Sequence, residues 1–144
     1  MSISTYESRQ GRIDCGAEDI YNFVTDIRNF ERFIPPDTFT NIKIERDTCS
    51  FRVGMLGEVS IRLKEKFFPD KVIFSGSARQ VNDFSLILNI ISPEADKSEV
   101  KVYLSADMNP FLKMVADEPV RYFLAKLIEE MESFRGWKEG YQDR

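Results

Sequence analysis

The feature that most constrains the fold is a period of two in hydrophobicity that runs from Phe39 to Met108. In the run EVSIRLKEKFF, for example, Val59, Ile61 and Leu63 alternate with polar residues such as Arg62. Successive side chains of a strand point to opposite faces, so each such run predicts a strand with one buried and one solvated face. Turn residues separate the runs at short intervals, which is typical of an antiparallel meander. The body of the fold is therefore expected to be an antiparallel sheet.

Seven strands are expected in all. The opening segment, 3–13, has no helical period and is rich in Ser, Thr and Tyr, which predicts a first strand. Pro69-Asp70 and Asn82-Asp83 are expected turns, and the polar stretch SPEADKSE is the expected link between the last two strands. The other six strands are expected at 41–45, 49–53, 58–68, 72–78, 84–91 and 100–108.

Two short helices are expected before the sheet. After Gly16, apolar residues including Ile20 and Phe23 recur at spacings of three and four, which predicts an amphipathic helix. A second short helix is expected over 28–34. Pro35 ends it, because proline disfavours helical geometry in the residue before it.

A long helix is expected after the sheet. Asn109 is a favourable capping residue and Pro110 suits the first helical position, so the helix should begin there and run to about Phe134. Pro119 either kinks this helix or divides it in two, since proline lacks a backbone donor. The remaining segment, 135–144, is expected to be a frayed tail.

One N-terminal segment carries a resemblance to a known superfamily. AEDIYNFVTDIRNFERFIPP combines an apolar helix, an aspartate (Asp26), an aromatic pair and closing prolines. With the opening strand and the Asn109-Pro110 helix start, it resembles the START and pollen-allergen-like helix-grip superfamily (SRPBCC), and within it the polyketide cyclase/dehydrase-like proteins. The resemblance implies one α+β domain over 1–144, ordered β-α-α-β6-α, in which a curved seven-stranded antiparallel sheet grips the last helix. It also implies a cavity between sheet and helix, closed at one end by the two small helices.

The parity of the strands and the stripe of the last helix predict which residues line such a cavity. Binding cavities are mostly apolar with few polar groups. The alternative is that the same side chains simply fill a core. The expected lining is Phe30, Phe33, Phe51, Val53, Ile61, Leu63, Glu65, Phe74, Leu86, Leu88, Val102, Leu104, Met108, Phe123 and Leu127.

Glu65 is the one charged member of this set. It shares the parity of Ile61, Leu63 and Phe67, so its carboxylate points inward if the strand keeps its register. A carboxylate there needs a partner or a raised pKa, and it would orient a ligand or act as a base. The alternative is a bulge or strand end that leaves Glu65 at the rim in water.

Composition narrows the chemistry further. The chain has no histidine, which removes the usual general base near neutral pH and the commonest metal ligand. Cys15 and Cys49 are far apart and lack metal-ligand spacing, so two buried or idle thiols are expected, with no metal and no cofactor. A net charge of −4 with mixed signs argues against nucleic acid as a partner. No apolar run approaches the roughly 20 residues of a membrane span, and the start lacks the pattern of a secretory signal, so a complete cytoplasmic protein is expected.

Three functions remain open from the sequence. The first is non-enzymatic binding, transport or sensing of a small hydrophobic molecule such as a lipid, an isoprenoid or an aromatic metabolite. The second is an enzyme of the cyclase or dehydratase kind, for which Glu65, Tyr6 and Tyr122 are the candidate acids and bases. The third is a protein-interaction module with a filled core and an exposed apolar patch. The sequence leaves the oligomeric state open.

Overall fold

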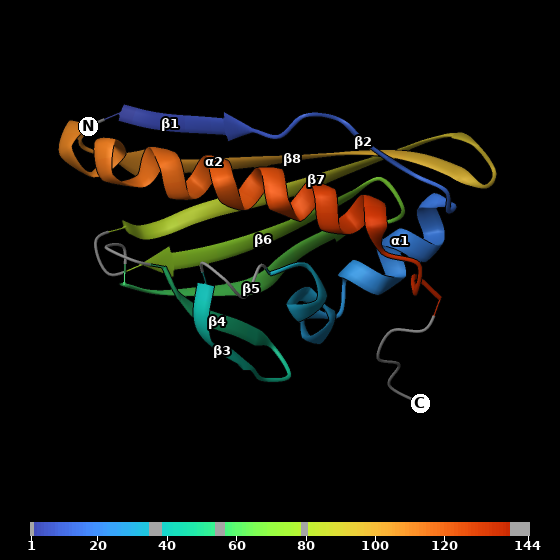
Figure 1. Ribbon diagram of the computed structural model, residues 1–144, viewed down its shortest axis with the longest axis horizontal. Helices are drawn as coiled ribbons and strands as arrows, with labels where there is room; N and C mark the ends of the chain where they lie inside the picture. Colours follow the sequence, from blue (N-terminus) through green and yellow to red (C-terminus); the bar gives the residue numbers. More distant parts are fainter. Residues whose placement is uncertain (1, 35–38, 54–56, 79–80, 139–144) are drawn as a thin grey trace.

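The computed structural model shows an α+β fold in which one antiparallel sheet curves around a long helix (Figure 1). It describes residues 2–34, 39–53, 57–78 and 81–138. The strands are β1 (Ser2–Glu7), β2 (Gly11–Ile13), β3 (Phe39–Ile44), β4 (Thr48–Val53), β5 (Gly57–Phe67), β6 (Lys71–Ala78), β7 (Val81–Glu94) and β8 (Lys97–Met108).

The sheet follows the chain from β3 to β8, each strand pairing with the next, and β1 then joins the far side of β8. All of these pairings are antiparallel. The expected antiparallel meander is confirmed. The first strand of the chain therefore lies beside the last one, rather than beside its sequence neighbours.

The sheet has eight strands rather than seven, because the expected opening strand is divided. Four steps separate Glu7 from Gly11, but only three separate their partners on β8, Tyr103 and Val100. The extra residue interrupts the ladder, as in a bulge. Ser8 bridges the interruption: its N–H donates to the Val102 carbonyl at 2.8 Å, and its hydroxyl accepts from the Val102 N–H at 2.9 Å.

Two expected connections also differ from the structure. β7 begins at Val81, so the expected turn at Asn82-Asp83 lies inside a strand. The stretch SPEADKSE is mostly strand as well, because β7 and β8 extend to Glu94 and Lys97 and pair there. These two strands form a long hairpin whose end contains polar residues paired within the sheet. The prediction was wrong here because it took a polar stretch for a loop.

Two short helices precede β3, as predicted: α1 (Ala17–Val24) and η1 (Ile27–Phe33), which is a 3₁₀ helix. Asp26 caps η1 by accepting from the Arg28 N–H at 3.0 Å. Asn29 is almost fully buried and donates from its amide to the Phe23 carbonyl at 2.8 Å, which ties η1 to α1. Pro35, the residue expected to end the second helix, lies outside the described residues.

The long helix α2 (Pro110–Ser133) crosses the concave face of the sheet and runs without a break through Pro119 (Figure 1). Its start follows the prediction, since the Asn109 side chain accepts from the Leu112 N–H at 2.8 Å. Beyond its end, Trp137 is buried against Phe23 and Phe33, so this part of the expected tail packs on the body of the fold. Within the described part of the chain, no helix has the length and apolar character needed to cross a bilayer.

Candidate functional site

An apolar cavity of about 70 Å³ lies between the first half of α2 and the sheet. Strands β3, β4, β5, β6, β7 and β8 contribute to its walls, and α2 covers it. Its partly exposed members are Ala78, Pro119 and Val120, which mark the side where it meets the surface. Every described residue around it is apolar: Phe39, Phe51, Val53, Val59, Ile61, Ala78, Phe84, Leu104, Ala106, Met108, Ala116, Pro119, Val120 and Phe123. We call it the first cavity.

A smaller void of about 20 Å³, the second cavity, lies under the second half of α2. The two small helices close this end, as the resemblance implied. Its lining is also apolar, and comprises Val24, Phe30, Phe33, Phe74, Leu86, Leu88, Val102, Leu127 and Met131. The two linings have no residue in common.

Space in the first cavity depends on Gly76 in β6. Gly76 pairs with Phe84 of β7, and a Cβ at Gly76 would lie 2.3 Å from the Phe84 ring. Real Cβ atoms do not approach so closely, so the ring lies flat over Gly76 only because that position has no side chain. The ring thus forms a wall of the cavity instead of filling it.

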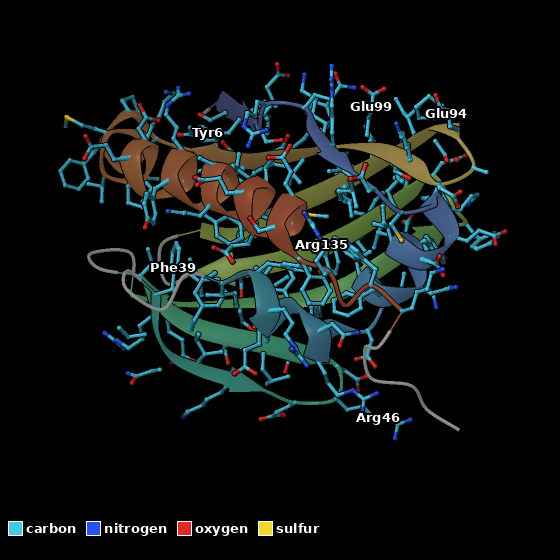
Figure 2. All side chains as sticks on the ribbon, turned by 45° about the vertical axis from the view of Figure 1, so that its right-hand side comes forward. Tyr6, Phe39, Arg46, Glu94, Glu99 and Arg135 are labelled. Carbon is cyan, nitrogen blue, oxygen red and sulfur yellow. The ribbon has the colours of Figure 1, made fainter. Side chains whose placement is uncertain are left out.

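Five phenylalanines form a layer across the interior beside both cavities. Phe39 of β3 contacts Phe51 of β4 with ring centroids 5.4 Å apart, and Phe123 of α2 at 5.6 Å. Phe123 in turn contacts Phe30 of η1 at 6.3 Å, and Phe30 contacts Phe74 of β6 at 5.9 Å. Figure 2 shows Phe39 among the side chains between the sheet and the helices. Such offset and edge-to-face pairs contribute about 0.5–1.5 kcal/mol each beyond their buried area.

The structure places most of the expected lining around these cavities. Phe51, Val53, Ile61, Leu104, Met108 and Phe123 border the first cavity, and Phe30, Phe33, Phe74, Leu86, Leu88, Val102 and Leu127 border the second. That these residues contact a ligand stays a prediction. Sequence reasoning missed others: strand parity could have found Val59, Ala78, Phe84 and Ala106, whereas no parity signal pointed to Phe39.

Glu65 was placed wrongly, because β5 contains a bulge between Leu63 and Glu65. The register shifts between them: Leu63 pairs with Phe74, whereas Glu65 pairs with Ile73. A shift of one residue moves the following side chains to the other face of the sheet. Glu65 is accordingly exposed, which is the alternative that the sequence left open. Leu63 lies opposite the buried Phe74 and packs against the core, but it borders neither of the two cavities. Phe67, expected on the inner face, is 50% exposed.

The other candidate acids and bases do not converge on a cavity. Tyr6 of β1 lies beside α2 (Figure 2), and its hydroxyl donates a hydrogen bond to Asp117. Burial, together with that hydrogen bond, raises the pKa of Tyr6 to about 12. Hydrogen bonds from Tyr6 and Lys113 hold the pKa of Asp117 below its usual range. Tyr122 packs its ring 6.4 Å from that of Phe39. The Tyr6–Asp117 hydrogen bond therefore links the first half of α2 to β1.

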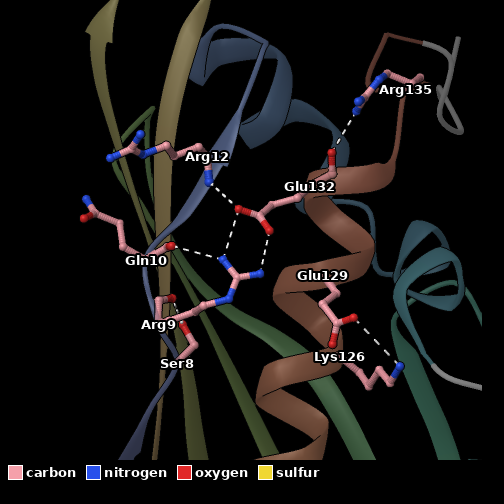
Figure 3. A network of polar contacts seen from close by, with 8 residues as sticks. All are labelled: Ser8, Arg9, Gln10, Arg12, Lys126, Glu129, Glu132 and Arg135. Atoms are coloured by element: carbon pink, nitrogen blue, oxygen red, sulfur yellow. Dashed lines mark hydrogen bonds and ion pairs between the residues drawn. The ribbon is translucent and has the colours of Figure 1, made fainter.

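A network of hydrogen bonds and an ion pair links the end of α2 to the N-terminal segment (Figure 3). Arg9 forms two hydrogen bonds with the carboxylate of Glu132, at 2.6 and 3.1 Å, and the Arg12 N–H donates to the same carboxylate at 2.9 Å. These donors lower the pKa of Glu132, with the Arg9 hydrogen bonds as the largest cause. Arg135 donates to the Glu132 carbonyl at 2.7 Å. Both halves of the helix are thus held against β1 and β2.

Both cysteines are buried free thiols, as predicted. Burial raises the pKa of Cys49 to about 12, and burial with the nearby Asp19 carboxylate raises that of Cys15. Thiols held in the neutral form are poor nucleophiles and poor metal ligands.

No protein-family model matches the sequence, and no curated protein matches it. Solved structures match over nearly the whole chain. Truncated norcoclaurine synthase from Thalictrum flavum has a TM-score of 0.71 at 10% identity, covering 92% of this chain and 92% of that one. The Zhui aromatase/cyclase from Streptomyces sp. R1128 has a TM-score of 0.64 at 13% identity, covering 97% and 100%. A START superfamily protein from Mycobacterium smegmatis has a TM-score of 0.61 at 14% identity, covering 91% and 97%.

The chain has the START-like helix-grip fold. The resemblance drawn from the N-terminal segment is thereby confirmed at the level of the fold, which hosts many unrelated functions. In this helix-grip protein the sheet packs closely against α2, and the first and second cavities between them are small and apolar. The activities of the synthase and the cyclase belong to those proteins.

Proposed function

We propose that this helix-grip protein binds a small, uncharged, apolar molecule in the first cavity, as a carrier or sensor, without catalysing a reaction. The observation that carries the proposal is the first cavity itself, whose described lining is apolar throughout. Such a site favours a ligand by burial, at about 25 cal/mol for each Å² of apolar surface removed from water. It disfavours a polar one, because burying an unpaired polar group costs roughly 2–7 kcal/mol.

The resting volume limits what fits without movement. An engineered apolar cavity of about 150 Å³ accepts benzene or xenon, and pockets for larger ligands measure roughly 300–1,000 Å³. The first cavity, at about 70 Å³, is smaller. A ligand larger than a few heavy atoms must therefore displace part of the wall.

The first half of α2 is the part of the wall best placed to move. Pro119 removes one hydrogen bond from the middle of the helix, and it lies at the mouth of the cavity. Between Pro110 and Pro119 the buried residues are Leu112 and Ala116, and Phe111 is 64% exposed. We propose that this half of α2 moves away from the sheet to admit the ligand. Amide hydrogen exchange as slow in residues 112–118 as in β7 and β8 would contradict this route.

Mass spectrometry of the natively purified protein, followed by analysis of its organic extract, tests the proposed function. We expect a reproducible neutral apolar molecule bound at one copy per chain. As an independent measurement, dissolved xenon should shift the methyl NMR signals of residues around the first cavity, such as Val53 and Val59. An empty protein whose methyl signals ignore xenon would refute the proposal.

A cyclase or dehydratase would need an acid and a base at the cavity. The described lining contains no titratable side chain, and the three candidates Glu65, Tyr6 and Tyr122 point to different places. A protein-interaction module is the second candidate, and the small volume of the first cavity favours it. Its expected surface is the exposed pair Phe67 and Phe68, 50% and 57% exposed. Loss of a co-purifying protein on Phe68→Ser substitution, with xenon binding absent, would select it.

A further inference from the structure

We propose that the two cavities are the two ends of one channel for an unbranched, uncharged chain, and that the rings of Phe30 and Phe123 form a partition which such a chain displaces. This inference rests on the proposed function and adds to it the shape of the ligand and the residues that select it.

The two cavities lie in line along α2. Three strands border both cavities: β8 passes from Leu104 in the first to Val102 in the second, β7 from Phe84 to Leu86, and β6 from Ala78 to Phe74. On α2 the lining positions run from Ala116 in the first cavity to Met131 in the second, which at 1.5 Å per residue is about 22 Å of helix. The combined site is therefore long and narrow.

The partition is a contact between two rings from different elements. Phe123 of α2 borders the first cavity, Phe30 of η1 borders the second, and their centroids are 6.3 Å apart. Each ring has other phenylalanines on one side and a void on another, so each can be displaced toward its void. Neither ring holds a polar contact that turning would break. A thin chain needs a smaller displacement of these rings than a fused ring system does.

The lining also selects the chemistry of the chain. Apolar side chains form the described walls of both cavities, so any polar end of the ligand has to remain at the mouth beside Pro119 and Val120. The chemical class is thus a linear hydrocarbon chain, with at most one small uncharged polar group at its outer end.

Primary alcohols serve as probes, with binding measured by titration calorimetry. From hexanol to dodecanol, we expect the affinity of the variants Phe30→Leu and Phe123→Leu to rise about fourfold for each methylene, which corresponds to about 0.8 kcal/mol. The unchanged protein should show a smaller rise once the chain reaches the rings. The variants should therefore bind dodecanol about tenfold more tightly than the unchanged protein does, and hexanol within twofold of it.

Phe23→Leu is the matched control, because Phe23 is similarly buried and packs against Phe33, Phe134 and Trp137, but borders neither cavity itself. It should leave the chain-length dependence unchanged. As a test of shape, the unchanged protein should bind 1-decanol at least tenfold more tightly than 1-adamantanol, which has the same number of carbons. Thermal unfolding reports whether each variant is folded. If Phe123→Leu does not fold, Phe123→Met takes its place.

Equal effects of the partition variants on hexanol and dodecanol would overturn the inference, as would equal affinities for decanol and adamantanol. These results would leave the first cavity as a binding site for compact molecules. Failure of both hexanol and xenon to bind any variant would instead refute the proposed function, and this inference with it.

Discussion

Filling the first cavity should stabilise the protein and abolish binding together. Ala106 of β8 is buried, borders the first cavity and lies opposite Phe84 on the neighbouring strand. Valine at this position adds two methyl groups on the inner face, where β-branched side chains suit a strand. Burying two such groups is worth about 1.6 kcal/mol.

The volume of the first cavity gives a second estimate of this stabilisation, of the same magnitude. At about 24 cal/mol per Å³, a cavity of about 70 Å³ costs roughly 1.7 kcal/mol. We therefore expect Ala106→Val to raise the free energy of unfolding by about 1 to 1.6 kcal/mol, or the melting temperature by about 3–5 °C for a chain of this length. Binding of xenon and hexanol should fall at least tenfold.

Urea unfolding and xenon-induced shifts of methyl signals measure the two effects on one sample. Ser105→Val is the control, since its side chain lies on the opposite face of the same strand and cannot fill the cavity. A destabilisation of 1 kcal/mol or more by Ala106→Val would mean that the space is not there. Greater stability with undiminished xenon binding would mean that xenon binds elsewhere.

Three further changes test the surrounding structure. Gly76→Ala should drive the Phe84 ring into the first cavity, weakening hexanol binding and lowering the free energy of unfolding by about 1–3 kcal/mol in urea. Tyr6→Phe should speed hydrogen exchange in the first half of α2, and it should remove a loss of stability between pH 10 and 12. That loss is expected because the folded pKa of Tyr6, about 12, exceeds the ordinary value of 10, so the folded state favours the neutral phenol. Glu132→Gln should lower the free energy of unfolding by about 1 kcal/mol near pH 7, because it removes the negative charge that Arg9 binds. It should have no effect once acid has protonated the Glu132 carboxyl. Equal effects at pH 7 and pH 3 would contradict the role given to this charge.

Local signals were enough for most of the fold. Asn109 and Pro110 mark the start of α2 through side-chain and backbone chemistry that acts within one helical turn. Alternation along β7 and β8 likewise identified Leu86 and Leu104 as inward residues. Such features depend only on neighbours in sequence, so the sequence alone reveals them.

Features that depend on distant partners were missed. The bulge in β5, which turns Glu65 outward, arises from how β5 pairs with β6, and no glycine or proline marks it. The docking of Trp137 depends on Phe23 and Phe33, more than 100 residues away in the chain. The volume of the first cavity depends on the ring at Phe84 lying over a glycine of another strand. Each of these features depends on contacts between residues that are far apart in sequence, and hydrophobic periodicity carries no information about such contacts.

The place of β1 in the sheet has a consequence for biosynthesis. Within the sheet, β1 is synthesised before the other strands, whereas its partner β8 is synthesised after them; Tyr6, for example, pairs with Leu104. Until then β1 has no neighbour with which to share its backbone hydrogen bonds, and a loop of almost a hundred residues has to close before it gains one. The meander from β3 to β8 can assemble in the order of synthesis, whereas the closure of the sheet and the docking of α2 follow as late, joint steps. During translation β1 is therefore an unpaired strand, open to pairing with other chains, until β8 has been made.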